Sequence, residues 1–147
     1  PEIARAVDLA AATIKSGGHI LYIGTGTSGR IATLDAAECP PTFGIPPEWV
    51  QAVMGGGPKA LVHASEGSED DRDKATADLK SKKLTKNDLV IGIAASGVTA
   101  YTHAALEFAR SKGAKTVALV CAQNTPMSKA ADPIQTGRPS AVLSVRQ

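Results

Sequence analysis

Short apolar runs alternate with segments of helical periodicity along the chain. Between Pro1 and Lys15, apolar residues recur at every third or fourth position, which predicts an amphipathic helix that ends at Gly17. Continuous apolar runs at 19–24, 50–54, 89–94 and 116–121 are typical of strands buried on both faces of a parallel sheet. Further helices are predicted over 28–37, 58–65, 70–84 and 99–112.

The alternation of strands and helices predicts an α/β fold. The expected architecture is a doubly wound, mostly parallel sheet with helices on both faces, as in Rossmann-like domains. Ala141–Val145 is another apolar run, so we expect the sheet to have five strands. Neither an internal repeat nor a linker interrupts the alternation, and 147 residues suit a single domain over 1–147.

Composition and charge argue against several classes of partner. The chain has 16 Lys and Arg against 14 Asp and Glu, and only 3% of its residues are aromatic, which argues against nucleic-acid binding. No apolar run approaches 18 residues, so no membrane partner is expected. Cys39 and Cys121 form neither a disulfide framework nor a zinc motif, which fits a reducing compartment and predicts a cytoplasmic protein.

A glycine-rich loop, Gly24–Arg30 (GTGTSGR), joins the first strand to the next helix and satisfies G-x-G-x-x-G. A dinucleotide site also needs a carboxylate near the end of the second strand, but that strand ends in Met54 and three glycines. The hydroxyls of Thr25, Thr27 and Ser28 with the N–H groups of a helix start suit a single phosphate monoester better. The alternative is a plain turn with Ser28 as the helix cap.

A second hydroxyl-bearing turn, Ala94–Thr99 (AASGVT), follows the third strand and opens another helix. Ligands of such sheets bind beyond the carboxyl ends of the strands, so two of these turns at neighbouring strand ends converge on one crevice. This predicts a phosphorylated small molecule as ligand. The alternative is that Ser96 or Thr99 only caps the helix.

Two carboxylates are candidates for chemistry. Glu38 is predicted at the end of the helix after the glycine loop, where the helix dipole disfavours an acid; it is either functional or an exposed surface residue. In the run Glu66–Asp71 (EGSEDD), Ser68 can cap the next helix, and Asp70 and Asp71 then form a favourable acidic first turn. This helix start gives no reason for Glu66 or Glu69, so both remain candidates for a function. A pair of carboxylates beside a sugar phosphate suits proton abstraction next to a carbonyl.

Four stretches together resemble one family in order and spacing. They are Gly24–Arg30, Asp35–Gly44 (DAAECPPTFG), Glu66–Asp71 and Gly92–Gly97 (GIAASG). They are similar to the N-acetylmuramic acid 6-phosphate etherases, which are built on the sugar isomerase (SIS) domain, a five-stranded parallel sheet flanked by helices. The Glu-Cys-Pro-Pro stretch is specific to these etherases, whereas the glycine loop and the Ser-Gly turn are shared by SIS domains.

The resemblance implies a lyase of bacterial cell-wall recycling that cleaves the lactyl ether of N-acetylmuramic acid 6-phosphate to N-acetylglucosamine 6-phosphate and D-lactate. It implies Glu69 as the base at C2 and Glu38 as the acid that protonates the lactyl oxygen. It also implies a homodimer with sites near the subunit interface, and no cofactor. No metal is expected, because no histidine pair has ligand spacing. The implied sugar- and phosphate-binding residues are Thr25, Gly26, Thr27, Ser28, Gly29, Ser96, Gly97 and Thr99.

The sequence also departs from that family. Val98 and Ala100 stand where the family has Arg and Pro, and Thr136–Gln147 does not match the family's C-terminal motif. The chain is therefore expected to be a truncated part of a longer family chain. Two alternatives follow: a non-catalytic sugar-phosphate-binding regulatory module like glucokinase regulatory protein, or an inactive copy. The presence of both Glu38 and Glu69 favours the lyase, and Glu-Cys-Pro-Pro argues against a sugar-phosphate isomerase.

Overall fold

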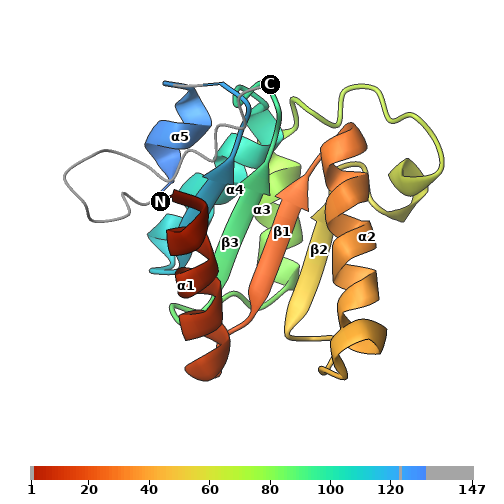
Figure 1. The fold of residues 1–147 in the computed structure, drawn as a ribbon. Helices are drawn as coiled ribbons and strands as arrows, with labels where there is room; N and C mark the ends of the chain where they lie inside the picture. Colours follow the sequence, from red (N-terminus) through yellow and green to blue (C-terminus); the bar gives the residue numbers. More distant parts are fainter. Residues whose placement is uncertain (1, 123, 132–147) are drawn as a thin grey trace.

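A parallel sheet lies between two layers of helices in the computed structural model, which describes residues 2–122 and 124–131 (Figure 1). The sheet order is β2-β1-β3-β4, and all neighbouring strands are parallel. The strands are β1 (Ile20–Gly24), β2 (Val50–Met54), β3 (Leu89–Ile93) and β4 (Lys115–Leu119). The predicted α/β class is confirmed, with four strands in the described part; the predicted strand Ala141–Val145 lies outside the described residues.

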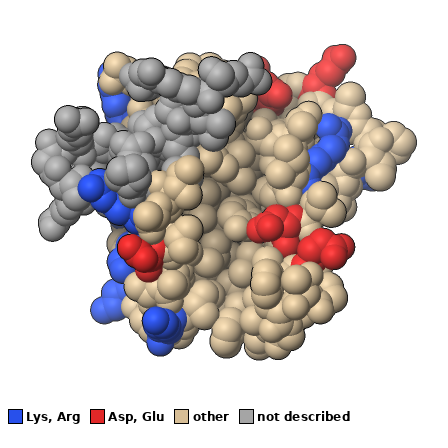
Figure 2. Space-filling model, viewed as in Figure 1, with Lys and Arg blue, Asp and Glu red and all other residues tan. Residues whose placement is uncertain are grey.

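Helices cover both faces of the sheet, as the doubly wound prediction requires. One face carries α1 (Glu2–Lys15) and α2 (Gly26–Phe43), and the other carries α3 (Arg72–Ser81), α4 (Ala100–Ser111) and α5 (Pro126–Ala130). A 3₁₀ helix, η1 (Pro58–Leu61), follows β2. Figure 2 shows that the surface over α1 and α2 is mostly uncharged. None of the described helices is long and apolar enough to cross a bilayer.

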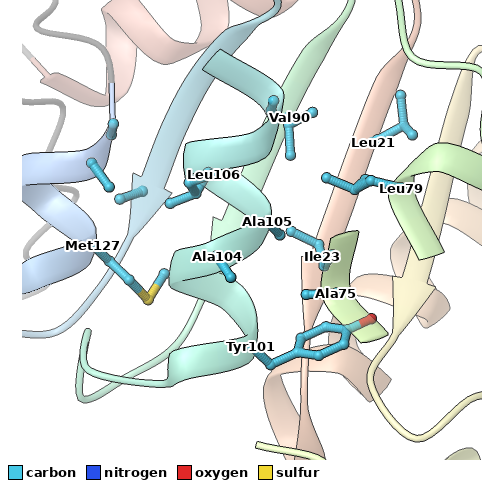
Figure 3. Close-up of a cluster of buried hydrophobic side chains, with 14 of the residues drawn as sticks. Leu21, Ile23, Ala75, Leu79, Val90, Tyr101, Ala104, Ala105, Leu106 and Met127 are labelled. Carbon is cyan, nitrogen blue, oxygen red and sulfur yellow. The ribbon is translucent and has the colours of Figure 1, made fainter. Parts of the chain in front are cut away.

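Continuous apolar strands follow from burial on both faces. Successive side chains of a strand point to opposite sides, so Leu21 and Ile23 of β1 face α3 and α4, while Ile20 packs toward α1 and α2. Figure 3 shows the larger cluster, in which Leu79 of α3 and Leu106 of α4 meet the strand residues. This packing fixes both helices against the sheet and so fixes the loops that precede them.

The predicted end of the second helix is wrong. Helix α2 continues through Pro40 and Pro41 and ends at Phe43, where Gly44 adopts φ +64° and donates its N–H to the Pro40 carbonyl at 2.8 Å. Prolines this close to a helix end remove only two backbone hydrogen bonds, so they do not stop the helix. Glu38 therefore lies within α2 and not at its C-terminus.

The segment between β2 and β3 also differs from the prediction. Of the helix predicted over 58–65, only the four residues of η1 are helical. The helix predicted over 70–84 is shorter, because Asp71 and not Ser68 is its N-cap: the Asp71 carboxylate accepts the Lys74 N–H at 2.8 Å. At its other end, Lys83 adopts φ +54°, which a helix does not continue through.

Candidate functional site

A pocket of about 330 Å³ opens beyond the carboxyl ends of β1 and β2. Its walls combine the start of α2, the end of β2 and the acidic turn before α3. The strand order reverses between β1 and β3, where ligands of open α/β sheets bind, so the pocket lies at the neighbouring pair of strand ends. The pocket is lined by Gly26, Arg30, Met54, Gly55, Ala60, Ala64, Ser65, Glu66, Gly67, Ser68, Glu69 and Asp70.

The glycine loop brings the backbone of α2 close to the sheet. Thr25, and not Ser28, is the N-cap of α2, and its hydroxyl makes no cap hydrogen bond. A Cβ atom on Gly29 would lie 2.4 Å from the Met54 Sδ atom, so a glycine there lets α2 pack on the strands. A Cβ atom on Gly55 would lie 2.5 Å from the Thr25 methyl group. The buried glycines therefore set the close packing around the pocket floor.

Glu69 reaches the glycine loop from the acidic turn. Its Oε1 atom lies 3.7 Å from the position that a Cβ atom on Gly26 would occupy, and both residues line the pocket. The Glu69 carbonyl accepts the Tyr101 N–H at 2.8 Å, which joins the acidic turn to the first turn of α4. The structure thus brings together the predicted base, the glycine loop and the helix after the second hydroxyl turn.

The second hydroxyl turn lies at the neighbouring strand end, because Ile93 of β3 pairs with Gly24 of β1. Gly97 adopts φ +68° and its N–H donates to the Ala94 carbonyl at 3.0 Å. Thr99 is the N-cap of α4 without a side-chain cap bond, so its hydroxyl is not used in capping. This turn stands next to the pocket and does not contribute to its lining.

The predicted hydroxyl ligands differ in their exposure. Thr25 is buried at 7% exposure, Ser28 and Thr99 are half-buried, and Thr27 and Ser96 are exposed. The exposed and half-buried hydroxyls stand at two strand ends that are neighbours in the sheet. A ligand placed across both turns would therefore reach them from solvent.

Glu38 is not part of this pocket within one chain. It is exposed and lies twelve residues after Gly26 on the same helix. At a rise of 1.5 Å per residue, this places it about 18 Å farther along α2. The structure therefore does not bring the two predicted catalytic acids, Glu38 and Glu69, together in a single copy of the chain.

Arg30 has a role that the sequence reasoning missed. Its Nε atom donates to the Leu61 carbonyl at 3.0 Å and its Nη2 atom to the His63 carbonyl at 3.1 Å. The guanidinium thereby holds the segment that forms one pocket wall. Residues four apart on a helix share a face, so the spacing of Arg30 from Gly26 is the sequence signal that indicates its direction.

The pocket is more acidic than basic. Glu66, Glu69 and Asp70 face the single lining cation, Arg30, whose donors already reach two carbonyls. Like charges repel, so this lining disfavours a dianion such as a phosphate monoester. Among residues 2–122 and 124–131, no three His, Cys, Asp or Glu side chains gather as metal ligands would.

Close relatives of this chain are etherases. The chain is 52% identical over 132 residues to N-acetylmuramic acid 6-phosphate etherase 1 of Bacillus licheniformis, and 51% identical over 132 residues to N-acetylmuramic acid 6-phosphate etherase of Erwinia tasmaniensis. Each alignment covers 90% of this chain but 43% of the relative, so the chain spans less than half of their length. The resemblance predicted from the sequence motifs is confirmed.

Solved structures with a similar fold include a phosphoheptose isomerase and a protein in complex with ManNAc-6P. A phosphoheptose isomerase from Francisella tularensis superposes with a TM-score of 0.67 at 19% identity, covering 89% of this chain and 68% of that one. The Vibrio vulnificus NanR protein complexed with ManNAc-6P has a TM-score of 0.54 at 18% identity, covering 88% and 39%. These likenesses show the fold.

The family itself is shown by the sequence. The profile of the glucokinase regulatory protein N-terminal SIS domain matches residues 2–110, which include β1 to β3, the glycine loop, the acidic turn and most of α4. Every loop that surrounds the pocket falls within this match. The chain therefore belongs to the family of the glucokinase regulatory protein N-terminal SIS domain.

Proposed function

We propose that this chain is the SIS domain of a carbon–oxygen lyase that cleaves the lactyl ether of N-acetylmuramic acid 6-phosphate. The products are N-acetylglucosamine 6-phosphate and D-lactate, in cytoplasmic recycling of cell-wall sugars. The observation that carries the proposal is the Glu69 carboxylate beside Gly26, in a pocket next to two hydroxyl-bearing turns. The names of the relatives supply the substrate.

The proposed reaction is an elimination followed by a hydration. The sugar opens to its aldehyde, which acidifies the C2 proton, and Glu69 removes that proton. The electron pair forms the C2–C3 double bond and expels the lactyl oxygen from C3, which takes a proton from Glu38. In the hydration, the ionised Glu38 takes a proton from the water whose oxygen adds to C3, and Glu69 returns its proton to C2 of the unsaturated aldehyde, so both carboxyl groups regain their starting states. The chain's residues supply these four proton transfers and the orientation of the substrate, and no redox step occurs.

The phosphate is proposed to bind at the hydroxyl turns. Thr27, Ser28, Ser96 and Thr99 offer hydroxyl donors at adjacent strand ends, and the N–H groups at the starts of α2 and α4 add further donors. In this placement the Glu69 carboxylate, which lies beside Gly26 at the start of α2, faces the sugar carbons.

Because Glu38 lies about 18 Å along α2 from the pocket, we propose that a second copy of the chain supplies the acid. Ile31, Leu34 and Glu38 lie at positions that share one face of α2, and the two apolar residues are 59% and 63% exposed. An exposed apolar stripe that carries Glu38 suits burial against a second copy. Such a homodimer would bring Glu38 toward the partner's Glu69.

Two carboxylate variants test the roles. Glu69→Ala and Glu38→Ala are each expected to lower D-lactate release from N-acetylmuramic acid 6-phosphate by at least about a hundredfold, the usual contribution of a general acid or base. In D₂O, Glu38→Ala is expected to keep exchange of the C2 proton of N-acetylglucosamine 6-phosphate, whereas Glu69→Ala loses it. Glu48→Gln, an exposed acid before β2, is the control. Release that survives both alanine variants would refute the assignment.

A regulatory sugar-phosphate sensor is the second candidate. The observation in its favour is that the two acids are separate within one chain, while the hydroxyls of the two turns stand at adjacent strand ends. A chain that binds N-acetylglucosamine 6-phosphate in calorimetry but releases no D-lactate at any concentration would support the sensor and exclude the lyase for this chain.

A further inference from the structure

Tyr101 is the largest of the fully buried side chains among the described residues. It stands in the first turn of α4, directly after the second hydroxyl turn. Figure 3 shows its ring extending from α4 beside Ala75 of α3. A tyrosine buried at 0% exposure needs a partner for its hydroxyl, so its contacts are informative.

Tyr101 contacts the pocket in two ways. Its backbone N–H donates to the Glu69 carbonyl at 2.8 Å. Its ring lies under the pocket floor, because a Cβ atom on Gly55 would be 3.2 Å from the ring Cε1 atom. Tyr101 thus contacts both Glu69, the predicted base, and Gly55, which lines the pocket floor.

The hydroxyl of Tyr101 makes a third contact, with the helix that follows Glu69. It donates to the Asp78 Oδ2 atom at 2.7 Å, and the other Asp78 oxygen pairs with Lys74. Burial raises the pKa of the Tyr101 hydroxyl, and the bond to Asp78 raises that pKa further, so the group stays a donor. Asp78 is 17% exposed in its side chain, so water competes little for this bond.

These contacts attach α4 to the acidic turn and to α3. The Tyr101 backbone holds Glu69 itself, and its hydroxyl holds α3 through Asp78, nine residues later. We propose that Tyr101 is a positioning residue for the proposed base: its bond to Asp78 fixes α3 against α4 and so sets the Glu69 carboxylate over the glycine loop. The proposal rests on the proposed function, in which Glu69 removes the C2 proton.

A positioning residue and a packing residue affect different measured quantities when they are substituted. A residue that only fills the core lowers the free energy of unfolding when it is altered and leaves the folded enzyme's rate unchanged. A displaced base lowers the rate of proton removal, because catalysis depends steeply on the placement of reacting atoms. Substrate affinity is affected less, since the phosphate binds at the hydroxyl turns.

The chain contains a matched control. Tyr22 of β1 is its other tyrosine; it is half-buried on the opposite side of the sheet, where burial and the Asp35 carboxylate of α2 raise the pKa of its hydroxyl. Tyr101→Phe and Tyr22→Phe each remove one tyrosine hydroxyl beside an aspartate and keep the ring. Both variants are expected to lose some thermal stability, but only Tyr101→Phe acts on Glu69.

The test compares D-lactate release and C2-proton exchange in these variants. Tyr101→Phe is expected to lower kcat about tenfold with KM within about twofold of the parent, while Tyr22→Phe keeps both within about twofold. Asp78→Ala, which removes the acceptor, should repeat the loss, and Lys74→Gln, which leaves the acceptor, should not. Equal rates for Tyr101→Phe and Tyr22→Phe would overturn the proposal.

An inactive parent chain is a separate result. It would overturn the proposed function, and hydrogen exchange would then test the positioning contact by itself. The amide at position 101 is expected to exchange at least about tenfold faster in Tyr101→Phe than in Tyr22→Phe, because its bond to the Glu69 carbonyl opens more often. Equal exchange in the two variants would show that the hydroxyl does not hold the Glu69 segment.

Discussion

Gly97 shows how one residue shapes the second hydroxyl turn. It adopts φ +68°, a conformation that a side chain disfavours. A Cβ atom there would also lie 2.5 Å from the Thr125 Oγ1 atom, and the Gly97 carbonyl accepts the Met127 N–H at 3.1 Å. The turn is therefore closed against the loop that follows β4, and only glycine fits both constraints.

Gly97→Ala is expected to lower the free energy of unfolding by about 2 kcal/mol or more, the sum of backbone strain and a clash with Thr125. Gly17→Ala is the matched control, because Gly17 has φ +78° and nothing within 4 Å of its Cβ position. It should cost only the strain, about 1 kcal/mol. Urea unfolding measures both. Gly97→Ala should also weaken binding of N-acetylglucosamine 6-phosphate, and equal losses in the two variants would contradict this account.

The sequence predicts which kinds of residue form the site better than it predicts the distances between them. Glu69 was a candidate because no helix cap or first turn explained it, and it lines the pocket. Glu38 was a candidate because it was expected at a helix end, but α2 continues past two prolines and leaves it within the helix. Its distance from Glu69 depends on the course of α2, which local pattern does not determine.

At the scale of elements, Asp88 joins the starts of the two central strands. It is 3% exposed and precedes β3 directly. Its carboxylate accepts the His19 N–H at 2.8 Å, just before β1, and the Thr85 N–H and hydroxyl at 2.7 and 2.9 Å. Burial raises the pKa of Asp88, but these hydrogen bonds outweigh burial, and the net pKa lies below the ordinary 3.8.

A depressed carboxylate pKa stabilises the fold above the unfolded-state pKa and loses this effect as the pH falls. For Asp88, the contribution is full at neutral pH and declines below pH 3.8 toward the lower pKa of the folded state. Asp88→Asn is expected to lower the free energy of unfolding by about 2 kcal/mol at neutral pH, because an amide cannot accept all of these donors. The difference from the parent should shrink near about pH 3.

Asp8→Asn, at an exposed position of α1, serves as the control for that measurement. It should follow the parent within about 0.5 kcal/mol at both pH values, as surface substitutions usually do. A loss for Asp88→Asn that stayed the same from neutral to acid pH would assign its effect to packing and not to the charge.

Strands were predicted more closely than the segments around the pocket, for a physical reason. A strand that is buried on both faces has a continuous apolar run in the sequence, and β2 has the predicted bounds Val50–Met54. The segment after β2 has no such pattern. Arg30 holds it through the Leu61 and His63 carbonyls, and a contact between residues about thirty positions apart leaves no periodic signal.

At the scale of the whole molecule, the surface over α1 and α2 is the feature that the sheet does not explain. It is mostly uncharged in Figure 2, and Ile3 and Val7 of α1 are 62% and 59% exposed, like the stripe on α2. The chain spans 43% of the length of its etherase relatives. The proposed homodimer predicts that this surface is buried in solution by a second copy, which sedimentation or light scattering would detect as twice the chain mass.

A dimer with shared sites makes a sharper prediction than mass does. Glu38→Ala and Glu69→Ala are each expected to be inactive, but a mixed dimer holds one site with an intact Glu38 from one chain and an intact Glu69 from the other. Random exchange of subunits makes half of the dimers mixed, each with one complete site of two, so about a quarter of the parent rate should return. Recovery requires that the acids act across the interface, because two variants with self-contained sites remain inactive at every mixing ratio. No recovery after demonstrated subunit exchange would therefore remove the shared site from the proposal, while Glu69 and the hydroxyl turns would still be tested by their own variants.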